Sequence, residues 1–369
     1  CFFSNKYQGR DDLFEGRQVW ENEALRKLQG TYPVVFMSFA SVKSGYDETK
    51  ANENMLDNVE AMKTAVKQVI SDIYAKYRDI IKSEMFDEND RAFFASVNDN
   101  MTDKTAHVAI RRLCGYLGKK VIVLLDEYDT PMQESWLYGY WNHALSFFRS
   151  FFVTTFKDND SIERGLITGI TRVSKESIFS ELNHLEVVTT ISDKYAASFG
   201  FTEEEVFQAL DELKLSEHKQ GVKKWYDGFT FGKHTDIYNP WSIIAFISKK
   251  GEYAPYWANT SSNSLVSALI QAGDVDAKKT VEDLMQGKSF TAPIDEQIAL
   301  NQLEGNTNAV WSLLLASGYL RMIGREPLSA ERKRRPRYTL TLTNMEVVFM
   351  FEDMVRDWFE MDAESSAYN

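Results

Sequence analysis

Val121-Ile122-Val123-Leu124-Leu125-Asp126-Glu127 is the stretch of sequence that decides the fold. Its five consecutive branched apolar residues predict a strand that is buried on both faces, and such strands occur in parallel sheets covered by helices. The strand ends in two adjacent carboxylates, and the carboxyl edge of a parallel sheet is where such sheets bind ligands. The stretch therefore predicts an α/β fold with a candidate site at Asp126 and Glu127.

Further strands and helices are predicted on both sides of this stretch. Residues 32–39 and 164–172 predict an earlier and a later strand, the first introduced by Pro33. Apolar residues recur at spacings of three and four in 52–81 and 104–117, and 131–156 is rich in aromatic residues, so we expect all three segments to be helical. The resulting order of strands and helices fits a doubly wound parallel sheet.

The pattern changes after about Ser192, where capped helices replace strand-like runs. Thr202 and Glu205 have the spacing of a capping box, and Asn239 and Pro240 are typical of a helix start. Toward the C-terminus a helix, two strands at 319–323 and 338–342 and a final helix resemble a winged-helix module. We therefore predict three parts: an α/β core at 1–191, a helical region at 192–300 and a winged-helix-like module with a linker helix at 301–369.

Composition excludes several classes of protein. The 369 residues include 42 Lys and Arg against 54 Asp and Glu, a formal net charge of −12. No apolar run approaches the ~18 residues of a membrane helix, two cysteines cannot form a disulfide framework, and five scattered histidines lack metal-ligand spacing. We expect a cytoplasmic protein. Because the chain begins with Cys1 and not Met, we also expect residues upstream.

The acids at the end of the strand have the arrangement of the Walker B motif of P-loop ATPases. Asp126 would hold Mg²⁺, because a hard cation prefers oxygen ligands, and Glu127 would polarise the attacking water. The alternative is a strand end whose acids only begin a turn at residues 129–131.

A P-loop ATPase also needs the phosphate-binding sequence G-x-x-x-x-G-K-[ST], which the chain does not contain. Gly287-Lys288-Ser289 has the right last three residues, but Glu282 stands where the first glycine is needed. Either the chain is no ATPase, or the phosphate loop lies before Cys1.

Eight segments resemble the bacterial and archaeal AAA-ATPase-like family, whose members commonly carry a C-terminal nuclease-like domain of the PD-(D/E)xK type. They follow one order along most of the chain: 121–131 (VIVLLDEYDTP), 164–172 (RGLITGITR), 177–185 (SIFSELNHL), 199–206 (FGFTEEEV), 225–228 (WYDG), 238–242 (YNPWS), 256–263 (YWANTSSN) and 342–347 (LTNMEV). The resemblance implies an ATPase that uses ATP and Mg²⁺. It also implies that the first strand, the Walker A loop and the nuclease-like domain are missing here, through truncation or genuine loss.

The resemblance also assigns residues. Asp126 and Glu127 match the Walker B acids, and the strand end at 168–172 matches the neighbouring sensor strand, where Thr168 or Thr171 would bond the attacking water or γ-phosphate and Arg172 would meet developing phosphate charge. Alternatively, Thr171 caps the next segment and Arg172 pairs with a surface acid. The segment with Pro240 resembles one that lies near the base or ribose, but a structural role is favoured here, because Asn-Pro usually caps a helix.

A basic loop is the remaining candidate for partner binding. Residues 332–337 carry five cations in six positions, and a winged helix can lay such a loop along phosphate. The alternative is a solvated hairpin loop. Two functions stay open: an ATPase that couples nucleotide state to its C-terminal region, possible as an oligomer, or a nucleotide-free module that binds protein or nucleic acid.

Overall fold

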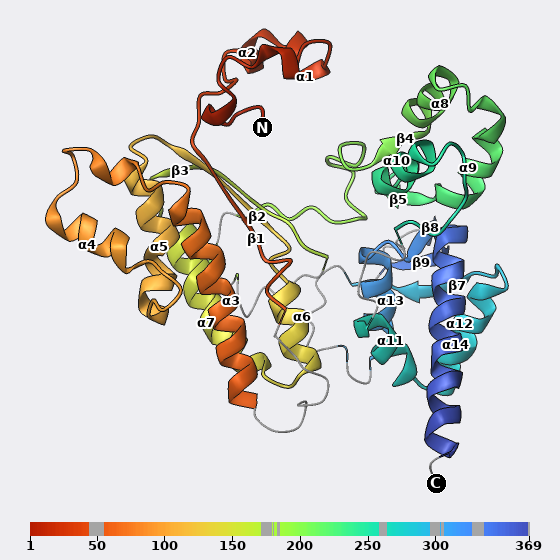
Figure 1. Ribbon diagram of the computed structural model, residues 1–369. Coiled ribbons are helices and arrows are strands. Elements are labelled where there is room, and N and C mark those ends of the chain that lie inside the picture. The colour runs from red at the N-terminus through yellow and green to blue at the C-terminus, as the bar shows by residue number, and fades with distance from the viewer. Residues whose placement is uncertain are drawn as a thin grey trace, which may run out of the picture. The chain divides into compact units, whose positions relative to one another are not determined.

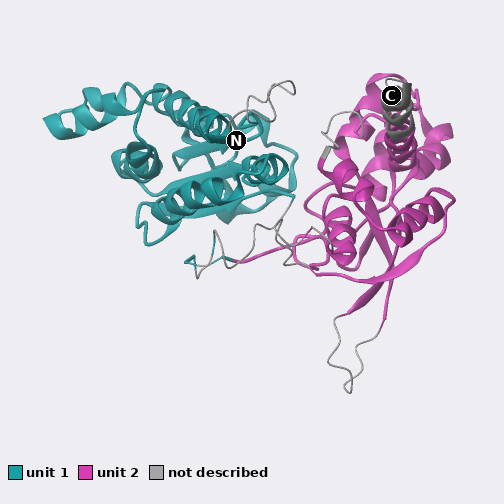
Figure 2. Cartoon of the chain, turned by 90° about the horizontal axis from the view of Figure 1, so that it is seen from below, with its two compact units in different colours: residues 1–185 teal, residues 186–369 magenta. Residues whose placement is uncertain are grey.

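The structure is a computed structural model that describes residues 1–43, 55–170, 179, 181–182, 185–257, 264–295, 303, 306–326 and 336–367. The chain forms two compact units, Cys1–Leu185 and Glu186–Asn369 (Figure 2). In the described part of the chain, no helix has both the length and the apolar character that crossing a bilayer requires.

Unit 1 is built on a three-stranded parallel sheet (Figure 1). The strands β1 (Val34–Ser38), β2 (Val121–Asp126) and β3 (Ile162–Ile167) lie side by side in the order β1-β2-β3. The register pairs Ser38 with Asp126 and Leu125 with Ile167. The predicted parallel α/β sheet is therefore confirmed, with β2 at its centre.

Three helices of unit 1 pack side by side: α3 (Met55–Ala75), α5 (Asp103–Tyr116) and α7 (Trp141–Phe156). Their apolar faces and the alternate residues Val121, Val123 and Leu125 of β2 are buried. Smaller elements complete the unit: η1 (Asn5–Tyr7), η2 (Asp11–Leu13), α1 (Gln18–Glu21), α2 (Glu23–Arg26), η4 (Ile80–Lys82), α4 (Glu88–Ser96) and α6 (Thr130–Leu137).

Two predictions for unit 1 need correction. The sheet is not buried on both faces: side chains on one face are buried, whereas Phe36 of β1 and Leu166 of β3 are 53% and 51% exposed. The helix predicted at 131–156 is divided into α6 and α7, because Gly139 between them has a φ of +77°, which a helix cannot contain. The aromatic pattern on both sides of the glycine concealed this break.

Unit 2 contains two three-stranded antiparallel sheets. The first has the order β4-β6-β5, with β4 at Phe201–Thr202, β5 at Phe229–Phe231 and β6 at His234–Tyr238. The second has the order β7-β9-β8, with β7 at Phe290–Pro293, β8 at Leu320–Arg325 and β9 at Arg337–Leu342. The predicted hairpin is thus present as β8 and β9, but 192–300 is not only helical, since β4, β5, β6 and β7 lie in it.

Helices surround both sheets of unit 2. They are α8 (Glu203–Glu212), η5 (Ser216–His218), α9 (Lys219–Tyr226), α10 (Pro240–Ser248), α11 (Ser264–Gln271), α12 (Val275–Met285), α13 (Thr307–Ala316) and α14 (Met345–Ala367). The capping box at Thr202 and Glu205 and the Asn239 cap are formed as predicted. The order α13, β8, β9, α14 is that of the predicted helix–hairpin–helix, to which β7 adds a third strand.

Candidate functional site

Asp126 lies at the carboxyl end of β2, between the ends of the two neighbouring strands. Its Oδ1 accepts a hydrogen bond of 2.6 Å from the hydroxyl of Thr168, which directly follows β3. Ser38, the last residue of β1, is its partner in register on the other side. Because parallel strands end at the same edge, Thr168 and Ser38 flank the exposed Asp126 on its two sides.

Backbone hydrogen bonds hold this edge together. The Thr168 amide donates to the carbonyl of Leu125 at 2.8 Å, and the amide of Tyr128 donates to the carbonyl of Thr168 at 3.1 Å. The amide of Phe39 likewise donates to the carbonyl of Asp126 at 3.0 Å. The sheet pairing therefore continues past the strand ends and fixes the residues that carry the candidate site.

Glu127 begins the turn between β2 and α6. Its φ is +51°, a left-handed conformation that is uncommon for a residue with a side chain. Its amide donates to Asp126 Oδ1 at 3.1 Å, and its Oε2 accepts from the hydroxyl of Thr130 at 3.0 Å. The two acids thus point differently, and Glu127 is held by a hydroxyl at the start of α6.

Asp129 is a buried acid that sequence reasoning did not select. It is only 1% exposed, and its Oδ2 accepts a hydrogen bond of 2.9 Å from the side-chain amide of Gln133. Gly169, just after Thr168, lies against it: a Cβ there would be 2.3 Å from Asp129 Oδ1 and 2.7 Å from the ring of Tyr128. The close approach of Gly169 therefore packs the end of β3 onto the turn after β2. An acid repeated two residues after Glu127 was the available signal.

The other predicted site residues do not join this cluster in the described structure. Thr171 and Arg172 lie outside the described residues, so their assigned roles stay predictions. Pro240 belongs to unit 2, where it occupies the first turn of α10 after the Asn239 cap, whose Oδ1 accepts from the amide of Trp241 at 2.9 Å. The structure gives Asn239-Pro240 a capping role.

The basic loop is described only at its end. Residues 332–335 lie outside the described residues. Arg337 begins β9, where its guanidinium donates to the carbonyl of Thr291 in β7 at 2.7 Å. This cation therefore bridges two strands, and partner binding by the loop stays a prediction.

The carboxyl edge suits one part of a nucleotide site. The exposed carboxylate of Asp126 and the hydroxyl of Thr168 are oxygen ligands of the kind that Mg²⁺ prefers, whereas the Ser38 hydroxyl accepts a hydrogen bond from the amide of Ala40. A phosphate cradle needs successive backbone amides of a glycine-rich loop before a helix, and the described residues offer none next to Asp126. The residues present fit a metal ligand and leave the phosphate-binding part to other segments.

A parallel sheet with an acid at the end of its central strand defines the class of protein. Unit 1 is a mixed α/β domain compatible with a P-loop-like fold. Residues 1–179 match the model of the AAA-ATPase-like family, described as predicted AAA-ATPase. The match covers nearly all of unit 1.

One curated relative extends the similarity beyond unit 1. It is an uncharacterized protein in the vnfD 5′ region of Azotobacter chroococcum mcd 1, 25% identical over 349 residues. The alignment covers 92% of this chain but 57% of the relative, so the chain spans little more than half of the relative's length. No solved structure matches the chain significantly.

Proposed function

We propose that unit 1 is the core of an ATP-binding and ATP-hydrolysing module of the AAA-like class. The observation that carries the proposal is Asp126 at the end of the central parallel strand, bonded at 2.6 Å to Thr168 from the next strand. The family match of residues 1–179 supports a general ATPase-like function. Mg²⁺, when bound with nucleotide, would neutralise phosphate charge at this edge.

Asp126 is the residue that would hold the metal. Its carboxylate is exposed at the sheet edge, and Thr168 orients it by donating to Oδ1. The bond to Oδ1 fixes the orientation of the carboxylate and leaves Oδ2 open to a further ligand. Thr168 therefore acts as a positioning residue for Asp126 in our proposal, as well as a candidate for contact with nucleotide.

Glu127 is the residue that would accept a proton from water. A carboxylate beside the metal ligand but aimed elsewhere can orient water separately from the metal. Here Glu127 Oε2 is bonded to Thr130, which holds the carboxylate in place while Oε1 can accept from a water. Arg172 would stabilise phosphate charge, and Thr171 would contact nucleotide; both assignments are carried over from the family resemblance.

The sheet offers a place for the missing phosphate-binding segment. In the described part of the chain, β3 pairs with β2 on one side only, and its residues 163–166 are exposed. A further parallel strand that paired with the free edge of β3 would bring a following loop to the carboxyl edge, beside Thr168. We propose that the Walker A loop enters in this way from a segment outside residues 1–369.

The remaining parts of the proposal concern the whole protein. Unit 2 would respond to nucleotide state through its winged-helix-like part, α13 to α14, and the basic loop at 332–337 would contact nucleic acid or protein. Association with a PD-(D/E)xK nuclease-like domain follows from the family resemblance alone. A cytoplasmic location is inferred from the two cysteines, which cannot form a disulfide framework, and assembly into an oligomer is part of the proposal.

The test is ATP turnover by the full-length protein that contains a Walker A loop. We expect Glu127→Gln to reduce turnover at least ~100-fold while ATP binding persists, because loss of a general base removes about two to four orders of magnitude. Asp126→Asn is expected to weaken Mg²⁺-dependent binding as well. Glu163→Gln provides the matched control, since this exposed acid lies at the opposite end of β3.

Equal turnover by wild type and Glu127→Gln would remove the catalytic assignment. If the full-length protein also failed to bind ATP, the alternative would stand: a nucleotide-free interaction module in which the acids serve the turn after β2.

A further inference from the structure

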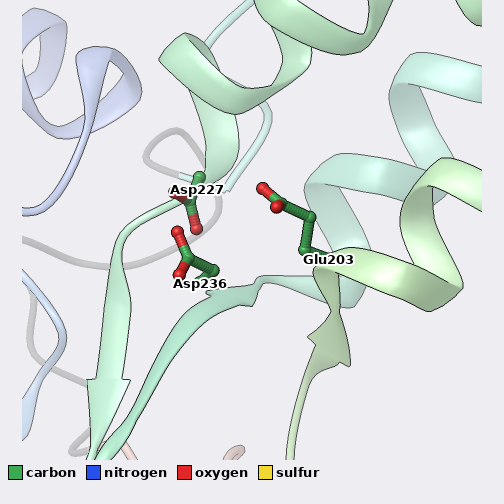
Figure 3. Close-up of side chains that lie close together, drawn as sticks. All are labelled: Glu203, Asp227 and Asp236. Carbon is green, nitrogen blue, oxygen red and sulfur yellow. The ribbon is translucent and has the colours of Figure 1, made fainter.

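Unit 2 contains a second group of acids, far from Asp126 in the sequence. Glu203 is the first residue of α8, Asp227 directly follows α9, and Asp236 lies in β6. One carboxylate oxygen from each lies within 4.8 Å of the others. Figure 3 shows Asp227 and Asp236 with their carboxylates facing one another and Glu203 reaching toward them from the start of its helix. Three elements thus direct negative charge to one place.

Asp227 differs from the acids of an ordinary surface cluster because it is buried. It is 5% exposed, and its Oδ1 has no hydrogen-bond partner among the residues that the structure describes. Burial, together with the charge of Asp236, raises the pKa of Asp227 to about 6. A buried acceptor without a donor is costly, so such a group calls for a partner.

Lys223 neutralises part of this negative charge. Its ammonium donates to Glu203 and, at 3.0 Å, to Asp236, whereas no bond to Asp227 accompanies them in the described structure. Those two carboxylates raise the pKa of Lys223 to about 12. Tyr238 also donates to Glu203, at 3.1 Å. One ammonium therefore faces three carboxylates and bonds two of them, and Asp227 Oδ1 keeps no hydrogen-bond partner among the described residues.

The backbone around Asp227 is fixed in place. Gly228 has a φ of +124°, and a Cβ there would lie 2.1 Å from the carbonyl oxygen of Thr343. The chain after Asp227 is thereby held against the segment that precedes α14. The backbone that carries Asp227 is therefore fixed by this close contact.

We infer that Glu203, Asp227 and Asp236 form a binding site for a divalent cation of the oxygen-preferring class, with Lys223 as its resident competitor. Ca²⁺ takes oxygen ligands at about 2.3–2.6 Å, which separates opposite ligands by roughly 4.6–5.2 Å. The 4.8 Å limit on the carboxylate oxygens fits this span, and Mg²⁺ or Mn²⁺ would need only a small closure. The cation would give Asp227 Oδ1 the partner that Lys223 does not provide.

The experiment measures cation binding by the full chain without nucleotide, in an Asp126→Asn background so that the sheet edge of unit 1 contributes no site. Titration with Ca²⁺ by calorimetry and with Mn²⁺ by electron paramagnetic resonance is expected to give one saturable site per chain. Asp227→Asn, which preserves the shape of the side chain, is expected to abolish it. Glu204→Gln, at the exposed neighbour of Glu203, is the matched control and is expected to bind as wild type.

Lys223→Met is expected to change cation affinity in the direction opposite to Asp227→Asn. Removal of the competing ammonium is expected to tighten binding by about tenfold, because one positive charge next to the ion is worth at least ~1.4 kcal/mol at such distances. Ca²⁺ should also raise the melting temperature of Lys223→Met more than that of wild type. No saturable site for either cation, or equal affinity in wild type and Asp227→Asn, would overturn the inference. Neither result depends on ATPase activity.

Discussion

Glu127 combines a candidate catalytic carboxylate with a strained backbone. A residue with a Cβ pays about 1 kcal/mol for a left-handed conformation that glycine adopts freely, and the φ of Glu127 is +51°. In this backbone conformation the Glu127 carboxylate accepts a hydrogen bond from Thr130. The backbone conformation that places the Glu127 carboxylate therefore lowers the stability of the folded protein.

Two substitutions at Glu127 test whether its backbone is strained. Glu127→Ala and Glu127→Gly both remove the carboxylate and its bond to Thr130, but only glycine relieves the backbone. We expect the glycine variant to be more stable than the alanine variant by about 1 kcal/mol in denaturant unfolding. An alanine variant equal to or more stable than the glycine variant would contradict a left-handed Glu127.

His107 links the stability of unit 1 to pH. Its ring packs against Phe147 with centroids 4.8 Å apart, and its Nε2 is buried with no hydrogen-bond partner in the described structure. Burial lowers the pKa of His107 below its ordinary value of 6.5, Asp103 opposes this, and Lys63 and Lys67 add to it. Below pH 6.5 the unfolded chain therefore binds more protons at this residue than the folded chain does.

The stability contributed by neutral His107 is thus complete above pH 6.5 and is lost as the pH falls toward the folded-state pKa. We expect His107→Phe to reduce the loss of unfolding free energy between pH 7.5 and 5.5, measured by urea denaturation. His143→Phe, at an exposed position of the neighbouring helix, should keep the wild-type dependence. An identical pH profile for all three proteins would remove His107 as the cause.

At the scale of elements, strong local patterns predicted the structure well. The apolar run of β2, the three-and-four spacing of α5 and the capping box of α8 each require one structure locally, and each is present. β5 and β6 were missed because they are three and five residues long and include the polar His234, Thr235 and Asp236. The two strands pair as a hairpin across a tight turn, and β6 also pairs with the distant β4, so neither strand is long enough to show a period of two.

The candidate sites also differ in how far the sequence predicts them. Asp126 and Thr168 follow predictable strands, so their meeting at one edge follows from parallel pairing. Ser38 and Asp129 were missed, because a serine at a strand end and an acid in a turn have ordinary structural uses. Glu203, Asp227 and Asp236 come together only through the packing of α8, α9 and β6, which no local spacing encodes.

At the scale of the whole molecule, the similarity to the curated relative involves both units. Unit 1 has 185 residues and unit 2 has 369 − 185 = 184, so an alignment of 349 residues must extend through most of both. The family match, by contrast, stays within unit 1. The two units therefore occur together in the relative, although each has buried apolar residues of its own.

Separate cores predict separate unfolding. Phe151 of α7 is fully buried in unit 1, and Phe246 of α10 is fully buried in the core of unit 2 with Tyr226 and Tyr238. Replacement of a buried Phe by Ala typically costs about 3–5 kcal/mol, and that cost falls on the cooperative unit that contains the residue. We expect scanning calorimetry to give two transitions, of which Phe151→Ala lowers one and Phe246→Ala the other. If either variant shifted both transitions equally, the two units would unfold as one cooperative body, and the prediction would be wrong.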